Sequence, residues 1–134
     1  LRAGRLSLDS VRVLAQGGWD FDIIDVDTYG QPWKHWDALL PRVRRRVTVI
    51  MTLGLVTIGG GINVGHELPR SAGLEFKRLR MPTALGARLY SRLLPYALSR
   101  LYIYGLQPEH LAEVTPPPKS NMRYIGITLN TDRT

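Results

Sequence analysis

Cysteine is absent from the 134-residue chain. This absence excludes a disulfide scaffold, a zinc ribbon, an iron–sulfur cluster and a thiol nucleophile. Low-complexity tracts are also absent, and 44% hydrophobic against 22% charged residues exclude a disordered or collagen-like protein. A chain of this length forms one domain with a core of its own. We therefore expect a single globular domain over residues 1–134, with the cytoplasm as its default location.

Several catalytic motifs are missing as well. No serine lies in the sequence pattern of a nucleophile elbow, which argues against a hydrolase. The three histidines and the acidic residues do not have the spacing of metal ligands, so we expect no metal site.

Acidic residues are scarce, with 11 Asp and Glu against 18 Lys and Arg and a formal charge of +7. Most of the excess is arginine, whose planar fork of donors suits phosphate, so nucleic acid is a candidate partner. The basic residues gather at 42–46 and again at 77–92. Either group could follow a phosphate backbone, and the alternative is a solvated basic face. The residues predicted to bind substrate there are Arg44, Arg45, Arg78 and Arg80.

Residues 47–65, VTVIMTLGLVTIGGGINVG, form an uncharged stretch that follows the arginines at 42–46. A membrane span with a positive flank has this pattern. However, the glycines at 59–61 have poor helix propensity, and the first part of the stretch is rich in β-branched residues. We therefore expect a buried strand at 47–53, a glycine-rich loop at 59–65 and no membrane association.

The rest of the chain alternates between helical and strand patterns. Helices are predicted at 6–16, with Ser7 as N-cap and Gly17 as stop, at 32–40 and at 83–100. Further strands are predicted at 21–27, 101–106 and 123–129. This order is typical of an α/β fold with a parallel sheet that ends in an antiparallel edge pair. Trp33 and Trp36 share one face of the second helix, which indicates core packing.

Two aspartates lie in the apolar segment FDIIDVDTYG at 21–30. Strand alternation places Asp25 and Asp27 on the same side at the carboxyl end of the strand, where open α/β sheets bind ligands. Acids in an apolar strand are costly unless they are paired or needed for function. We interpret Asp25, Asp27 and the following Tyr29 as a candidate site. The alternative is that one aspartate caps the turn or the next helix and the other is solvated.

The segment IDVDTYGQP at 24–32 resembles the fourth-strand motif of class I S-adenosylmethionine-dependent methyltransferases. It is most similar to the Asp-x-Asp-Pro-aromatic-Gly-x-Pro form of tRNA guanine-N2 methyltransferases, with Thr28 in the place of the motif's proline. The resemblance implies that the chain is the carboxyl-terminal part of a Rossmann-like methyltransferase sheet. In that family, strand seven is inserted antiparallel beside strand six, and residues 101–106 and 123–129 fit strands six and seven.

The resemblance also implies an activity, which is N-methylation of a nucleic acid or another anionic substrate with S-adenosylmethionine as cofactor. Because the sulfonium donor is already activated, such an enzyme mainly aligns the nucleophile. The implied catalytic residues are Asp27, Asp25 and Tyr29. Asp27 would accept an N–H of the amine, Tyr29 would stack on the base, and Asp25 would lie near the cofactor or support the turn.

The cofactor-binding signals of that family are missing upstream of the motif. No glycine-rich turn after a first strand and no acid at the end of a second strand precede residue 24, and GGGINVG at 59–65 lacks the G-x-G-x-x-G spacing. We therefore expect an incomplete methyltransferase-like domain, inactive alone, that relies on a missing amino-terminal half or on self-association. The alternative is a non-catalytic basic module for nucleic-acid binding or assembly that retains the fold.

Overall fold

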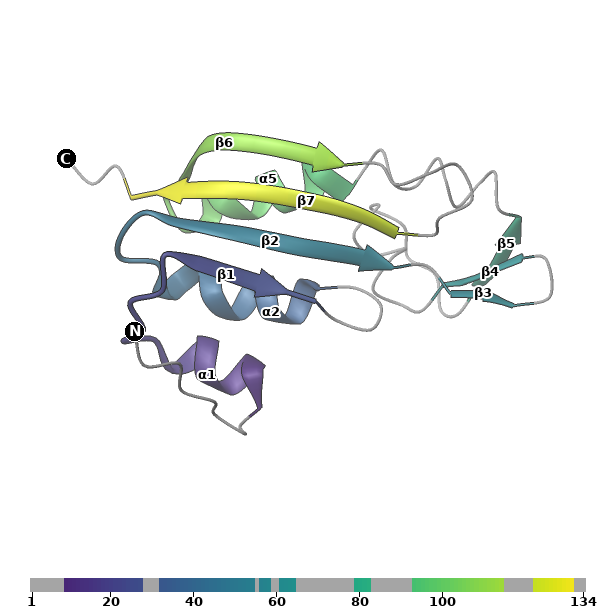
Figure 1. Ribbon diagram of the computed structural model, residues 1–134, viewed down its shortest axis with the longest axis horizontal. Coiled ribbons are helices and arrows are strands. Elements are labelled where there is room, and N and C mark those ends of the chain that lie inside the picture. Colours follow the sequence, from purple (N-terminus) through teal and green to yellow (C-terminus); the bar gives the residue numbers. More distant parts are fainter. Residues whose placement is uncertain are drawn as a thin grey trace.

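The structure is a computed structural model that describes residues 9–27, 32–54, 56–58, 61–64, 79–82, 93–114 and 122–131. These residues form a mixed α/β arrangement with a four-stranded sheet and a separate three-stranded sheet. The four-stranded sheet is one layer, and in Figure 1 its helices lie behind it. The α/β class expected from the alternation of strands and helices is confirmed.

The four-stranded sheet has the order β1-β2-β7-β6. Its strands are β1 (Ile23–Val26), β2 (Val47–Gly54), β6 (Gln107–Val114) and β7 (Met122–Asn130). β1 runs parallel to β2, whereas β7 is antiparallel to both of its neighbours. The strands predicted at 21–27, 47–53 and 123–129 are confirmed to within a few residues. Each of these segments is an apolar, β-branched run, which suits a pleated sheet that is buried on one side.

The strand predicted at 101–106 is wrong. Residues 101–103 are the last turn of helix α5 (Leu93–Ile103), and the strand at this edge of the sheet is β6. Leu93, Ala97 and Leu101 are buried at helical spacing, and this packing outweighs the β propensity of the tyrosines around them. The helix ends where Gly105 adopts a φ of 65° and the Leu106 N–H donates to the Leu101 carbonyl at 3.1 Å.

The other helices begin and end close to the predicted residues. Helix α1 (Ser10–Gln16) is capped by Asp9, whose carboxylate accepts the Val11 N–H at 3.0 Å, and it stops at Gly17 with a φ of 69°. The cap is therefore Asp9 and not Ser7, which lies outside the described residues. Helix α2 (Trp33–Leu39) follows Pro32 and continues into a short 3-10 turn, η1 (Leu40–Arg42). Of the helix predicted at 83–100, residues 83–92 lie outside the described part.

The hydrophobic core lies between the sheet and the three helices. Trp36 is fully buried, and its Nε1 donates to the Ala97 carbonyl at 3.1 Å, which joins α2 to α5. Trp33 is also buried and lies edge-on to Tyr96 with ring centroids 4.8 Å apart. The predicted core position of both tryptophans is confirmed. Leu14 is the residue of α1 that is buried in the same cluster.

An ion pair at the rim adds a second link between α2 and α5, because Arg100 Nε donates to Asp37 Oδ1 at 2.8 Å. Partial burial acts to lower the pKa of Arg100. The hydrogen bond and the negative charge of Asp37 outweigh this effect, so the pKa lies above its ordinary value. The ion pair with Asp37 therefore favours the charged form of the guanidinium.

The second sheet was not expected. It has the order β3-β4-β5, all antiparallel, with β3 (Val56–Ile58), β4 (Gly61–Val64) and β5 (Leu79–Pro82). Residues 61–64 are thus the central strand of a sheet, and the glycine-rich loop predicted at 59–65 is wrong over that range. Glycine weakens a strand, but pairing on both sides satisfies the backbone of this one. Within the described ranges, no helix is long and apolar enough to cross a membrane.

The packing of α5 makes a prediction about stability. Leu101→Ala removes a side chain that is 1% exposed, and we expect it to lower the free energy of unfolding by about 2–4 kcal/mol. Ile103→Ala, two residues further along the same helix, removes a side chain that is 62% exposed and should cost less than about 0.5 kcal/mol. Urea denaturation followed by circular dichroism measures both. Equal losses for the two variants would contradict the position of α5 on the sheet.

Candidate functional site

The two aspartates of the sequence motif lie at the carboxyl end of β1. Asp25 is in the strand and Asp27 directly follows its last residue, and both are exposed. Ile24 and Val26, which alternate with them, are buried on the side of the helices. Asp25 therefore lies on the face of the sheet opposite the helices. Asp27 follows the end of the strand, and that it shares this side stays a prediction.

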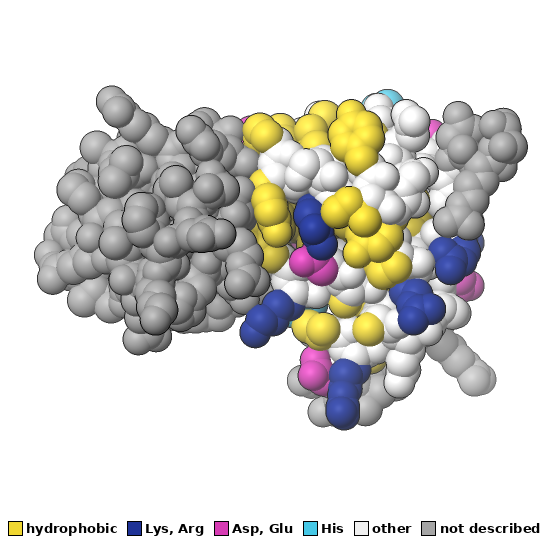
Figure 2. Space-filling view, turned by 180° about the vertical axis from the view of Figure 1, so that it is seen from behind, with side chains coloured by type: hydrophobic (Ala, Val, Ile, Leu, Met, Phe, Trp, Pro, Cys, Tyr) yellow, Lys and Arg dark blue, Asp and Glu magenta, His cyan; other side chains and the backbone are white. Residues whose placement is uncertain are grey.

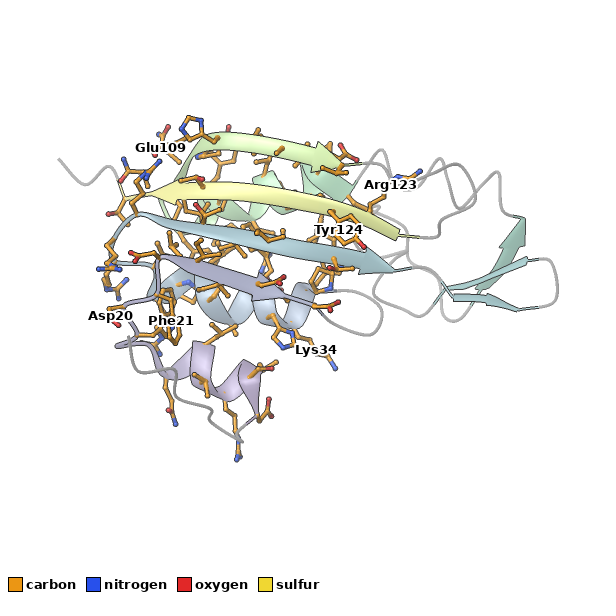
Figure 3. All side chains as sticks on the ribbon, viewed as in Figure 1. Asp20, Phe21, Lys34, Glu109, Arg123 and Tyr124 are labelled. Carbon is orange, nitrogen blue, oxygen red and sulfur yellow. The ribbon has the colours of Figure 1, made fainter. Side chains whose placement is uncertain are left out.

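Asp25 has apolar and small neighbours on this face. Its register partner in β2 is Ile50, and the partner of Ile50 in β7 is Gly126. Tyr124 lies one row further toward the carboxyl end of β2, paired with Thr52, and is labelled in Figure 3. Two carboxylates beside such a surface can accept hydrogen bonds from a donor such as an amine, because an ionised carboxylate is an acceptor only.

The structure places the remaining predicted site residues apart from these aspartates or does not describe them. Tyr29 and Arg78 lie outside the described residues, and Arg80 is in β5, where only the backbone is described. Of the predicted catalytic set, the structure describes Asp25 and Asp27, which are two positions apart at the carboxyl end of β1.

Arg44 and Arg45 lie at the opposite end of the sheet, in the loop that enters β2. Because β1 and β2 are parallel, this loop lies beside the start of β1, about 16 Å from Asp27 along the strand. Arg45 Nη2 donates to Asp22 Oδ1 at 2.5 Å and to the Asp20 carbonyl at 2.7 Å. Arg44 Nη1 donates to two carbonyls of its own loop. These guanidinium groups therefore fasten the loop, and they do not share a site with the aspartates.

Arg46 forms an ion pair with an acidic residue that is far from it in the sequence. Its Nε donates to Glu109 Oε2 in β6 at 2.5 Å, while the other oxygen of Glu109 accepts from Asn130 Nδ2 at 2.7 Å. The hydrogen bond from Arg46 is the main cause that lowers the pKa of the Glu109 carboxyl, and the charge of Arg46 acts in the same direction. This rim cluster of Arg46, Glu109 and Asn130 ties β6 and β7 to the start of β2. Sequence reasoning missed it, because Glu109 and Arg46 are 63 positions apart.

The described charged side chains of the helical face do not form one basic patch. In Figure 2, the described Lys and Arg side chains are spaced across this face, with apolar and acidic side chains between them. No group of three or more His, Asp or Glu side chains that could hold a metal ion occurs in the part of the chain that the structure describes. The candidate site is therefore the carboxyl end of β1, where Asp25 and Asp27 are both exposed.

Comparisons of the chain with protein-family models, with curated proteins and with solved structures found no match. The family resemblance of residues 24–32 therefore stays a prediction. What the geometry adds is the position of the two aspartates, the order of the strands and the partners of the arginines.

The Arg46–Glu109 contact makes a prediction about titration. We expect the carboxyl of Glu109 to titrate below the ordinary glutamate range, because the neighbouring guanidinium favours its charged form. Its contribution to stability is then present above the ordinary pKa and is lost as the pH falls through the lowered one. Carbon-detected NMR titration measures the pKa directly. Arg46→Gln should return it toward the ordinary value, whereas Arg12→Gln, on α1, should not move it.

The partners of Arg44 and Arg45 make a prediction about binding. We expect Arg45→Ala and Arg44→Ala to leave the affinity for single-stranded RNA within about twofold, because both groups already donate within the protein. Fluorescence anisotropy over a range of salt concentrations measures this. A phosphate contact would instead lower the slope of log K against log salt by about one for each arginine removed. That result would restore the predicted substrate role.

Proposed function

We propose that this chain is the acceptor-binding, carboxyl-terminal portion of an S-adenosylmethionine-dependent methyltransferase that modifies an amine nitrogen. The observation that carries the proposal is the strand order, in which β7 lies antiparallel between β2 and β6 after two parallel strands. The family resemblance of residues 24–32 implies this arrangement for its fourth to seventh strands. It makes β1 the fourth strand and places the aspartates at the end where ligands bind in open α/β sheets.

In this proposal the role of Asp27 is to hold the acceptor. An exposed carboxylate just beyond the end of a strand can accept one N–H of an amine and so direct the nitrogen lone pair away from itself, toward an electrophile. Asp25 lies two residues earlier on the same face and supports the turn or a second polar group of the substrate. The resemblance adds Tyr29 as the stacking residue.

The described residues do not fit a complete site for S-adenosylmethionine. Asp25 pairs with the apolar Ile50 of β2, and the sequence before β1 has no glycine-rich turn of the G-x-G-x-x-G kind. We therefore assign the donor to polypeptide beyond the described residues and derive no step through it. A nucleic acid is one anionic substrate of this kind, although the described arginines at 44–46 have partners within the protein.

The test of the proposal is transfer of a labelled methyl group. With the natural protein, methyl-tritiated S-adenosylmethionine and bulk tRNA, we expect Asp27→Asn to lower the rate by about 10²-fold or more, because the neutral amide has a single acceptor oxygen and lacks the negative charge that makes the carboxylate a strong acceptor. The affinity for tRNA should change by less than about twofold. Asp20→Asn, the same chemical change at the other end of β1, is the matched control and should keep full activity. Absence of transfer by the natural protein, or an active Asp27→Asn variant, would contradict the proposal.

A further inference from the structure

Strand β6 ends the four-stranded sheet on the side opposite β1, and it pairs with β7 alone among the described strands. All eight of its residues are exposed, although its neighbour β7 is buried at Ile125, Ile127 and Leu129. Figure 1 shows β6 as the outermost strand, with α5 behind the sheet. The outer edge of such a strand presents a row of N–H and C=O groups that can pair with another strand.

The features that protect an edge strand from association are concentrated at one end of β6. Pro108 and the β-bulge between Pro108 and His110 interrupt pairing near its start. Beyond the bulge, the pairing with β7 is regular from His110 to Val114. These five residues include no lysine, the residue that most often blocks an exposed edge, and their one charged residue is Glu113. The second half of β6 can therefore accept a further strand.

Apolar side chains are exposed along the same edge. Leu111 is 48% exposed and pairs with the buried Ile127, which places it on the helical face of the sheet. Val114 is 58% exposed and pairs with Tyr124 on the other face. Figure 2, which shows the helical face, has apolar side chains along its upper margin, where β6 and α5 lie. The edge therefore offers apolar contacts in addition to backbone hydrogen bonds.

The end of α5 adds an aromatic side chain beside this edge. Arg100 points toward α2, because its Nε donates to Asp37. Tyr102 is two residues later and thus about 200° further round the helix, on the side away from α2. Since α2 lies behind β1 and β2 (Figure 1), the side away from it is the side of β6. Tyr102 is 85% exposed there.

We propose that β6 pairs antiparallel with β6 of a second copy of the chain, around a two-fold axis normal to the sheet. The two sheets then form one continuous sheet of eight strands, four from each copy. A two-fold axis in this direction keeps the helices of both copies on the same face. The inference uses neither β1 nor the aspartates, and it stands whether or not the chain is a methyltransferase.

The side chains of β6 favour one register for this pairing. With Leu111 on the axis, the two Leu111 side chains lie directly opposite each other on the helical face, and His110 lies opposite Ala112 on the other face. Moving the axis by one residue would place Leu111 opposite Glu109 or Glu113. In the favoured register Glu113 faces Glu109 of the second copy, and the ion pair with Arg46 already offsets the charge of Glu109. The edge is thus complementary to itself.

The area of the edge is sufficient for a weak dimer. Covering Tyr102, Leu111, Val114 and the outer backbone of β6 would remove about 500–600 Å² from water on each copy. The total of about 1,000–1,200 Å² is at the lower end of specific interfaces. We therefore expect an equilibrium between monomer and dimer that depends on concentration.

The first test is analytical ultracentrifugation of the natural protein at about 1–100 µM, where the mass should rise from one chain to two. Leu111→Lys places two like charges opposite each other at the axis and should raise the dissociation constant at least about tenfold. Ile23→Lys is the matched control, because Ile23 is 65% exposed at the other edge of the sheet, and it should change the constant less than about twofold. A monomer at every concentration, or a dimer that Leu111→Lys leaves unchanged, would overturn the proposal.

The second test measures the register. The 134 residues contain no cysteine, so Leu111→Cys introduces a thiol that is new to this sheet. Oxidation should link it to its counterpart, because side chains directly opposite in a sheet have Cβ atoms about 4.5–5.5 Å apart, close to the span of a disulfide. Mass spectrometry of the linked peptides identifies the position. Ile23→Cys should give no linked dimer, and a link through position 23 with none through position 111 would show that the copies meet at β1 and overturn the proposal.

Discussion

The register between β2 and β7 is the constraint on which the rest of this structure depends. Eight residue pairs run from Val47 with Leu129 to Gly54 with Met122. Because side chains alternate with a period of two, this register turns the buried aliphatic residues toward the helices, namely Val47, Val49 and Met51 of β2 and Ile125, Ile127 and Leu129 of β7, and a slip of one residue would turn them away. On the other face, Thr48 Oγ1 and Thr128 Oγ1 share a hydrogen bond of 2.9 Å that belongs to this register alone.

Much of the fold could be predicted, because burial leaves a local pattern wherever an element faces the core. The β-branched runs of β1, β2 and β7 and the stop at Gly17 are signals of this kind. The edge strand β6 is exposed along its whole length, so its sequence has no alternation of apolar and polar residues, and the β propensity of the tyrosines before it predicts a strand in the wrong place. Strand β4 was missed for a different reason. Its glycines have low intrinsic preference for a strand, and pairing with β3 and β5, which is not local, overrides that preference.

The candidate site also has a part that could be predicted from the sequence and a part that could not. That Asp25 alternates with the buried Ile24 and Val26 follows from the two-residue period of a strand and needs no tertiary information. The roles of Arg45 and Arg46 depend on acids that are 23 and 63 positions away. The run of arginines therefore suggests a phosphate partner when only the sequence is considered. In the structure, two of these arginines form ion pairs with acidic residues of the same chain. The composition predicted that the net charge is positive, whereas the contacts in the structure show which arginines have acidic partners.

The position of β7 has a consequence for the time course of folding. Val47 pairs with Leu129, which is synthesised 82 positions later, so the edge of β2 that faces β7 has no partner strand until then. The closure entropy grows only with the logarithm of the loop, so the second sheet inserted between β2 and α5 costs the folded state little. At about 5–20 residues per second, however, the ribosome needs about 4–16 s to reach the end of β7. Throughout that interval the unpaired backbone edge of β2 can pair with strands of other chains. We therefore expect the chain to need chaperone protection mainly while it is being translated.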